Sequence, residues 1–77
     1  MATIVIYKRG YVGSYYYVTN NINELNILNG VFSLINVDGL QFITISRIEA
    51  YGEYHPSQEI KTIPELLSIV GRLAQGE

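Results

Sequence analysis

The sequence predicts a small α+β domain that is mostly β: five or six antiparallel strands in a curved sheet or small open barrel, of SH3-like or PH-like geometry, with one C-terminal α-helix packed on the sheet. Three observations predict this class. Two dipeptides typical of tight hairpin turns, Asn29-Gly30 and Asp38-Gly39, lie about one strand length apart in an apolar stretch. The chain opens with alternating β-branched residues, and it ends with apolar residues at helical spacing.

The stretch from Leu25 to Ser46 is predicted to be a three-stranded meander, with strands at residues 24–28, 31–37 and 40–46. Both dipeptides favour the type I′ turn, because Asn, Asp and Gly tolerate the positive φ that this turn needs. Two-residue loops at these sites place a set of apolar side chains on one face of the sheet: Leu25, Ile27, Phe32, Leu34, Ile43 and Ile45. A slip of one residue would destroy this face, so we expect the register to be fixed.

Three further strands are predicted around the meander. Residues 2–8 are apolar on both faces, which predicts a central strand or one that is covered on both sides. Residues 11–19 form a tyrosine-rich strand, and residues 47–54 continue the sheet after a bulge or corner near Ser46-Arg47. The asparagine-rich link at residues 20–23 is predicted to be a loop, although its spacing also fits one helical turn.

The last element is predicted to be a helix over residues 63–75, after a polar loop at residues 55–61. Thr62 and Glu65 have the spacing of a capping box, and Pro64 falls in the first turn, where no amide donor is missed. We expect this helix to cover the apolar face of the meander, in its own subunit or in a neighbouring one. Its apolar stripe is Ile63, Leu66, Leu67, Val70, Leu73 and Ala74.

Composition limits the classes of function. The 77 residues are expected to form one domain with a small core, and such domains often gain stability by self-association. A formal net charge of −2 argues against binding to nucleic acid or anionic lipid. No leader or membrane-spanning run is recognisable, so the expected location is the cytoplasm. Only 16% of the residues are charged, and low surface charge favours association.

Two groups of residues are candidates for an interaction surface. The first is a run of tyrosines, which can anchor a protein, stack on bases, or form a packed sheet with its hydroxyls at the rim: Tyr11, Tyr15, Tyr16 and Tyr17. The second is an apolar cluster on the otherwise polar face of the meander, which is either an exposed patch or covered by another part of the chain, for instance the N-terminal strands: Ile35, Val37, Leu40 and Phe42.

The sequence predicts no enzyme, no cofactor and no metal site. His55 is the only histidine, and no cysteine is present to act as a nucleophile or zinc ligand. Glu49 and Glu53 could share one strand face, but a pair of catalytic carboxylates needs burial to separate their pKa values. No nucleophile elbow, phosphate loop, EF-hand or dinucleotide fingerprint is present.

Residues 29–49 read Asn-Gly-Val-Phe-Ser-Leu-Ile-Asn-Val-Asp-Gly-Leu-Gln-Phe-Ile-Thr-Ile-Ser-Arg-Ile-Glu. This stretch, about a quarter of the chain, resembles a double-hairpin unit of small accessory proteins from phages and prophages of low-GC Gram-positive bacteria. The resemblance implies a small non-enzymatic protein that binds and blocks a host or defence component in the bacterial cytoplasm. It transfers no functional residue to this chain.

The predicted function is therefore that of a non-enzymatic protein-interaction module that self-associates and acts as a phage-type inhibitor. The alternative is a small-ligand binder, such as a sponge for a nucleotide signal. In that case tyrosines would stack on the base, and Lys8, Arg9 or Arg47 would contact a phosphate. Nucleic-acid binding has the least support because the net charge is negative, and no membrane partner is expected.

Overall fold

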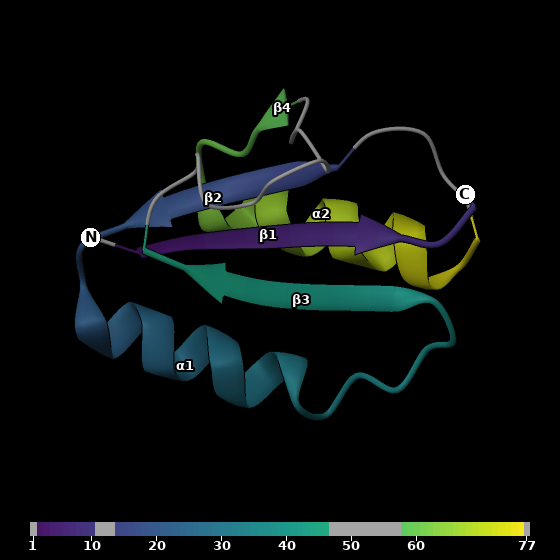
Figure 1. The fold of residues 1–77 in the computed structure, drawn as a ribbon, viewed down its shortest axis with the longest axis horizontal. Coiled ribbons are helices and arrows are strands. Elements are labelled where there is room, and N and C mark those ends of the chain that lie inside the picture. Colours follow the sequence, from purple (N-terminus) through teal and green to yellow (C-terminus); the bar gives the residue numbers. More distant parts are fainter. Residues whose placement is uncertain (1, 11–13, 47–57, 77) are drawn as a thin grey trace.

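The structure is a computed structural model that describes residues 2–10, 14–46 and 58–76. These residues form a four-stranded sheet of order β3-β1-β2-β4 and two helices (Figure 1). In chain order the elements are β1 (Ala2–Lys8), β2 (Tyr15–Thr19), α1 (Ile22–Phe32), β3 (Leu40–Ile45), β4 (Gln58–Glu59) and α2 (Ile63–Ala74). The α+β class and the C-terminal helix are confirmed, whereas the described part of the chain has fewer strands than predicted.

Strand β1 lies at the centre of the sheet, as its apolar residues on both faces predict. It pairs antiparallel with β2 on one side, where Ile4 is opposite Tyr17, and with β3 on the other side, where Ile4 is opposite Thr44. Ile4, Val5 and Ile6 are fully buried. Because both neighbours run antiparallel to β1, they are parallel to each other, and α1 lies in the crossover that links them.

The predicted all-antiparallel pairing is wrong at β4, which makes the sheet a mixed, open one. This two-residue strand pairs parallel with β2, with Tyr15 opposite Gln58 and Tyr16 opposite Glu59. The backbone N–H of Ile60 then donates to the carbonyl of Tyr16 at 2.7 Å. The polar loop predicted at residues 55–61 therefore contains a short edge strand, which is too brief to carry an alternation of side chains.

The first predicted hairpin is also wrong, because α1 takes its place. The predicted strands at residues 24–28 and 31–37 fall in and just after this helix, and Asn29-Gly30 lies within it rather than at a turn. Leu25, Leu28 and Phe32 recur at helical spacing and pack against the core. The preference of one dipeptide for a turn is local, so burial of this stripe outweighs it.

A side-chain cap fixes where α1 begins. Asn21 has extended backbone dihedrals, and its side-chain oxygen accepts hydrogen bonds from the backbone N–H groups of Asn23 and Glu24 at 3.0 and 3.2 Å. These N–H groups would otherwise have no partner within the helix. The asparagine-rich link, predicted to be a loop with one helical turn as the alternative, therefore starts a full helix.

The second turn dipeptide, Asp38-Gly39, does form a turn, but the strand after it presents to the helices the face opposite to the predicted one. Gly39 has a φ of 84°, and the backbone N–H of Leu40 donates to the carbonyl of Val37 at 3.1 Å. Ile43 and Ile45 pair with Val5 and Thr3, so they point to the face away from the helices. The predicted single apolar face is therefore wrong: Phe32 is buried, whereas Ile27 and Leu34 are exposed and Ile43 and Ile45 point to the other side of the sheet.

Helix α2 begins as the capping box predicts. The Thr62 hydroxyl accepts from the backbone N–H of Glu65 at 3.2 Å, and the Glu65 carboxylate accepts from the backbone N–H of Lys61 at 3.1 Å. The side that the helix buries differs slightly from the predicted stripe, because Ile69 is buried and Leu67 is 49% exposed. The buried side of the helix is therefore rotated slightly about the helix axis relative to the predicted stripe. Packing on the sheet decides this rotation, and the spacing of apolar residues alone does not.

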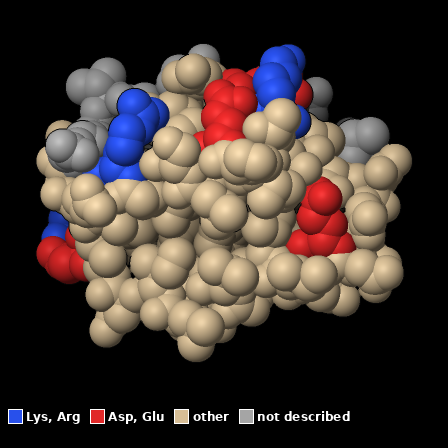
Figure 2. Space-filling view, turned by 180° about the vertical axis from the view of Figure 1, so that it is seen from behind, with Lys and Arg blue, Asp and Glu red and all other residues tan. Residues whose placement is uncertain are grey.

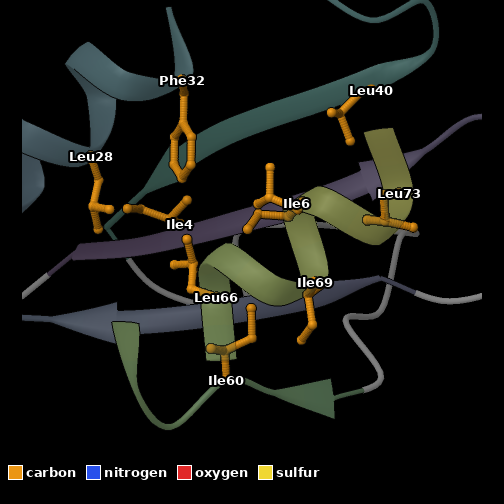
Figure 3. Close-up of a cluster of buried hydrophobic side chains, with 10 residues drawn as sticks. Ile4, Ile6, Leu28, Phe32, Leu40, Ile60, Leu66, Ile69 and Leu73 are labelled. Carbon is orange, nitrogen blue, oxygen red and sulfur yellow. The ribbon is translucent and has the colours of Figure 1, made fainter. Parts of the chain in front are cut away.

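Both helices cover the same face of the sheet, as Figure 3 shows. The face carries Ile4 and Ile6 from β1, and α2 lies behind β1 and β2 in Figure 1 while α1 runs along the β3 side. The buried cluster consists of Ile4, Ile6, Leu28, Phe32, Leu40, Ile60, Leu66, Ile69, Val70 and Leu73.

Several predictions fall outside the described residues. These are residues 11–13 of the second predicted strand, the predicted strand at residues 47–54, and the side chains of Glu49, Glu53 and His55. Within the described ranges, neither helix is long and apolar enough to cross a membrane.

Candidate functional site

The outer side of α1 carries exposed aliphatic side chains although it faces away from the core. Ile27 and Leu34 are large aliphatic side chains, yet they are 67% and 84% exposed. They are seven residues apart, which is about two helical turns, and they lie opposite the buried stripe. We call the exposed residues on this side the outer ridge of α1: Asn23, Asn26, Ile27, Gly30 and Leu34.

Leu34 lies just beyond the helix but stays on the same side, because the chain ends α1 with a tight turn. The backbone N–H of Ser33 donates to the carbonyl of Asn29 at 3.0 Å, and that of Leu34 donates to the carbonyl of Val31 at 3.1 Å. The Ser33 hydroxyl also donates to the carbonyl of Gly30 at 2.7 Å. These bonds satisfy carbonyls that a helix end leaves open, and they hold Leu34 in the line of the ridge.

The outer ridge carries no charged side chain. Glu24 is the single charged residue of α1, and its carboxylate accepts a hydrogen bond from the Tyr17 hydroxyl at 2.8 Å. Figure 2 shows the side covered by the helices, and its charged groups lie along the top, at the left edge and, as one acidic group, at mid-height on the right. The lowest part of this surface, where α1 runs, shows none. Water-facing helix surfaces are usually charged, so this one is suited to contact with another apolar surface.

Nothing in the described part of the chain requires a glycine at position 30. Its φ is not positive, and a Cβ at this position would meet nothing within 4 Å. Glycine in the middle of a helix lowers stability by about 1 kcal/mol relative to alanine. Gly30 is also at the centre of the outer ridge, where a missing side chain leaves room for a close approach from outside.

The tyrosines that were predicted as an interaction surface do not lie together: they point to two faces of the sheet, and one lies outside the described residues. Tyr15 and Tyr17 point to the helix face and pack against the core, whereas Tyr16, which pairs with Val5, points to the other face. The hydrogen bond to Glu24 is the main cause of a raised pKa of the Tyr17 hydroxyl, with burial and the charge of the carboxylate adding to it. Tyr11 lies outside the described residues.

The second predicted cluster is covered by the chain itself. Leu40 is buried, and Ile35, Val37 and Phe42 are partly buried against the same core. Phe42 stacks on Phe32 with ring centroids 4.1 Å apart and an angle of 5° between the planes. The sequence leaves open whether this cluster is exposed or covered by another part of the chain, and the structure shows that it is covered. Helix α1 supplies part of this cover, which was expected to come from the N-terminal strands.

The described cations that were candidates for an anion site contact groups of the protein. The Lys8 ammonium donates to the carbonyl of Leu73 at 2.8 Å, at the negative end of the α2 dipole. Arg9 forms an ion pair with Asp38 at 2.7 Å, and both side chains are largely exposed. The third candidate, Arg47, lies outside the described residues.

A shallow cavity of about 230 Å³ lies where α1 begins, lined by Ala2, Thr19, Asn20, Asn21, Ile22 and Leu25. Its polar groups serve the local fold: the Asn21 side chain caps α1, and the Thr19 hydroxyl accepts from the backbone N–H of Asn21 at 3.1 Å. In the described ranges no three acidic, histidine or cysteine side chains gather as metal ligands would.

The outer ridge was not among the sequence-based candidates, although the sequence contains a signal for it. Once α1 begins at Asn21, Leu25, Leu28 and Phe32 define the inner side. The same helical spacing then leaves Ile27 and Leu34 on the outside, between uncharged asparagines and a glycine. A stretch that is apolar on both sides of a helix indicates burial on both sides.

Comparison with known protein families gives a match over nearly the whole chain. The profile of a family of unknown function (DUF6718) matches residues 1–73. No curated protein and no solved structure matches.

Proposed function

The chain belongs to the family of unknown function DUF6718, and we propose that it is a non-enzymatic protein-interaction module whose contact surface is the outer ridge of α1. One observation carries the proposal: Ile27 and Leu34 stand 67% and 84% exposed on a helix side without charge. Covering a large aliphatic side chain contributes about 1.5–3 kcal/mol when burial is complete, so a partner that covers both gains a useful part of this.

The other candidate surfaces give weaker support to a binding function. Leu40 and Phe42 already contribute to the core, and the Tyr17 hydroxyl is engaged with Glu24. The nucleotide-binding alternative needs cations free to meet a phosphate, whereas Lys8 caps α2 and Arg9 pairs with Asp38. The role of a phage-type inhibitor stays a prediction, and it depends on a resemblance to a double hairpin whose first hairpin is replaced by α1.

Site-specific photo-crosslinking in cells that express the chain tests the proposal. A photoreactive residue is placed at Leu34 on the outer ridge, and in a control chain at Gln41, which is exposed on β3 and points away from the helices. We expect protein adducts at Leu34 that are absent at Gln41, because only the first position lies in the contact. Mass spectrometry of the adducts identifies the partner.

Equal yields at the two positions, or no adduct at Leu34, would contradict the proposal. In the chain with the photoreactive residue at position 34, the further substitution Ile27→Lys places a charge in the outer ridge without changing a core residue. This substitution should remove the adducts.

A further inference from the structure

We infer that the partner of the outer ridge is a second copy of this chain, which docks its own ridge in a two-fold helix–helix contact whose axis passes between Gly30 and Val31. The inference rests on the proposed function, because it names the partner of the same surface. It concerns homo-association only, so a ridge that binds a different protein would leave the proposed function standing and overturn the inference.

The charge of the ridge favours a second copy as the partner. The exposed ridge residues are uncharged, and the one acidic group of α1, Glu24, is engaged with Tyr17. Two such surfaces meet without like-charge repulsion, whereas a charged partner would lose hydration and find no opposite charge. The amides of Asn23 and Asn26 each donate and accept, so they can bond to the same residue types of a copy.

The order of residues along the ridge also suits a two-fold axis. In an antiparallel crossing centred at Gly30 and Val31, Ile27 of one copy lies against Leu34 of the other, and the reverse contact follows by symmetry. Both side chains are exposed, and between them lies a glycine with open space around its Cα. Small residues at the centre of a crossing let two helices approach closely, so the flanking aliphatic side chains can interlock.

The size of the contact predicts a weak dimer. Helix α1 has 11 residues and is therefore about 16 Å long. One side of such a helix buries clearly less than the roughly 800 Å² per partner of a standard stable interface. We therefore expect a dimer of the transient class, populated at high protein concentration, and the measurements should extend to about 1 mM chain.

Sedimentation equilibrium of matched glycine variants tests the inference. Gly30→Glu puts two like charges at the proposed two-fold axis, and Gly71→Glu adds the same charge at another helical glycine whose Cβ would also meet nothing within 4 Å. We expect a reversible dimer for the wild type. The dissociation constant of the dimer should stay within twofold of the wild-type value for Gly71→Glu and rise at least tenfold for Gly30→Glu. Circular dichroism confirms that each variant is folded.

Mixing two variants separates a two-fold contact from other causes. Gly30→Glu and Gly30→Lys should each be largely monomeric alone, and an equimolar mixture should recover dimers, because opposite charges then meet at the axis. A wild-type chain that stays monomeric at about 1 mM, equal dimerisation of Gly30→Glu and the wild type, or no recovery in the mixture would overturn the inference. If ridge adducts still form in cells after such a result, the proposed function stands with another partner.

Discussion

The hydroxyl of Tyr17 joins β2 to α1 through its hydrogen bond to Glu24, and this contact makes stability depend on pH. The bond raises the pKa of Tyr17, as do burial and the nearby carboxylate. A group with a raised pKa in the folded state stabilises fully below its unfolded pKa of about 10, and this contribution disappears as the pH rises through the folded value.

Tyr17→Phe should therefore lower the free energy of unfolding at pH 7, and its difference from the wild type should shrink above pH 10. Urea unfolding of both chains at pH 7, 10 and 11.5 measures this difference. Tyr16→Phe, which leaves the bond to Glu24 in place, is the control. A difference that stays constant over this range would show that the hydroxyl does not donate to the carboxylate in solution.

The two turn dipeptides show what a single pair of residues can determine. Gly39 has a φ of 84°, and its carbonyl accepts from the backbone N–H of Arg9 at 2.8 Å, so a turn is required at this point. Asn29-Gly30 has the same local preference but lies in a helix. The difference comes from the neighbours: Leu28 and Phe32 flank Asn29-Gly30 at helical spacing, and both reach the core.

At the scale of the element, the caps decide more than the dipeptides. Helix α2 was predictable because Thr62, Pro64 and Glu65 mark its start and its apolar residues have a helical period. Helix α1 has the same kind of start at Asn21, but Ile27 and Leu34 interrupt its polar side, which hides the period. A helix with large aliphatic residues on its outer side therefore looks, in one sequence, like a pair of strands.

Asn21→Ala should lower the free energy of unfolding by about 1 kcal/mol, because two backbone N–H groups at the start of α1 lose their acceptor. Thermal unfolding by far-UV circular dichroism measures the change. Asn21→Asp keeps the acceptor and places a negative charge at the positive end of the helix, so it should be at least as stable as the wild type. If the alanine and aspartate variants are equally stable, residue 21 does not cap a helix.

At the scale of the whole molecule, the pairing of segments that are distant in the chain could not be predicted from the sequence. The central position of β1 could be predicted, because its residues are apolar on both faces. Its neighbours could not, since β3 pairs with it across the intervening α1 crossover, and β4 joins β2 in parallel over two residues. Such contacts leave no local pattern, whereas hairpin signals are local and dominated the prediction.

The arrangement of the whole chain also explains why α1 is available to a partner. Helix α2 buries four apolar residues against the sheet, whereas α1 lies along the β3 side with only its inner stripe in the core. The crossover thus holds α1 against the sheet and leaves its other side exposed. A surface held in this way needs little reordering on binding, which lowers the entropic cost of the contact.

The central claim is that the chain binds through the outer ridge, and a concentration series of ¹H–¹⁵N NMR spectra tests it most directly. Between about 20 μM and 1 mM, we predict amide shift changes concentrated at Asn23, Asn26, Ile27, Gly30 and Leu34, with Gln41 and Gly71 unchanged. Shift changes centred on the sheet face that carries Tyr16, or none along the ridge over this range, would contradict the account.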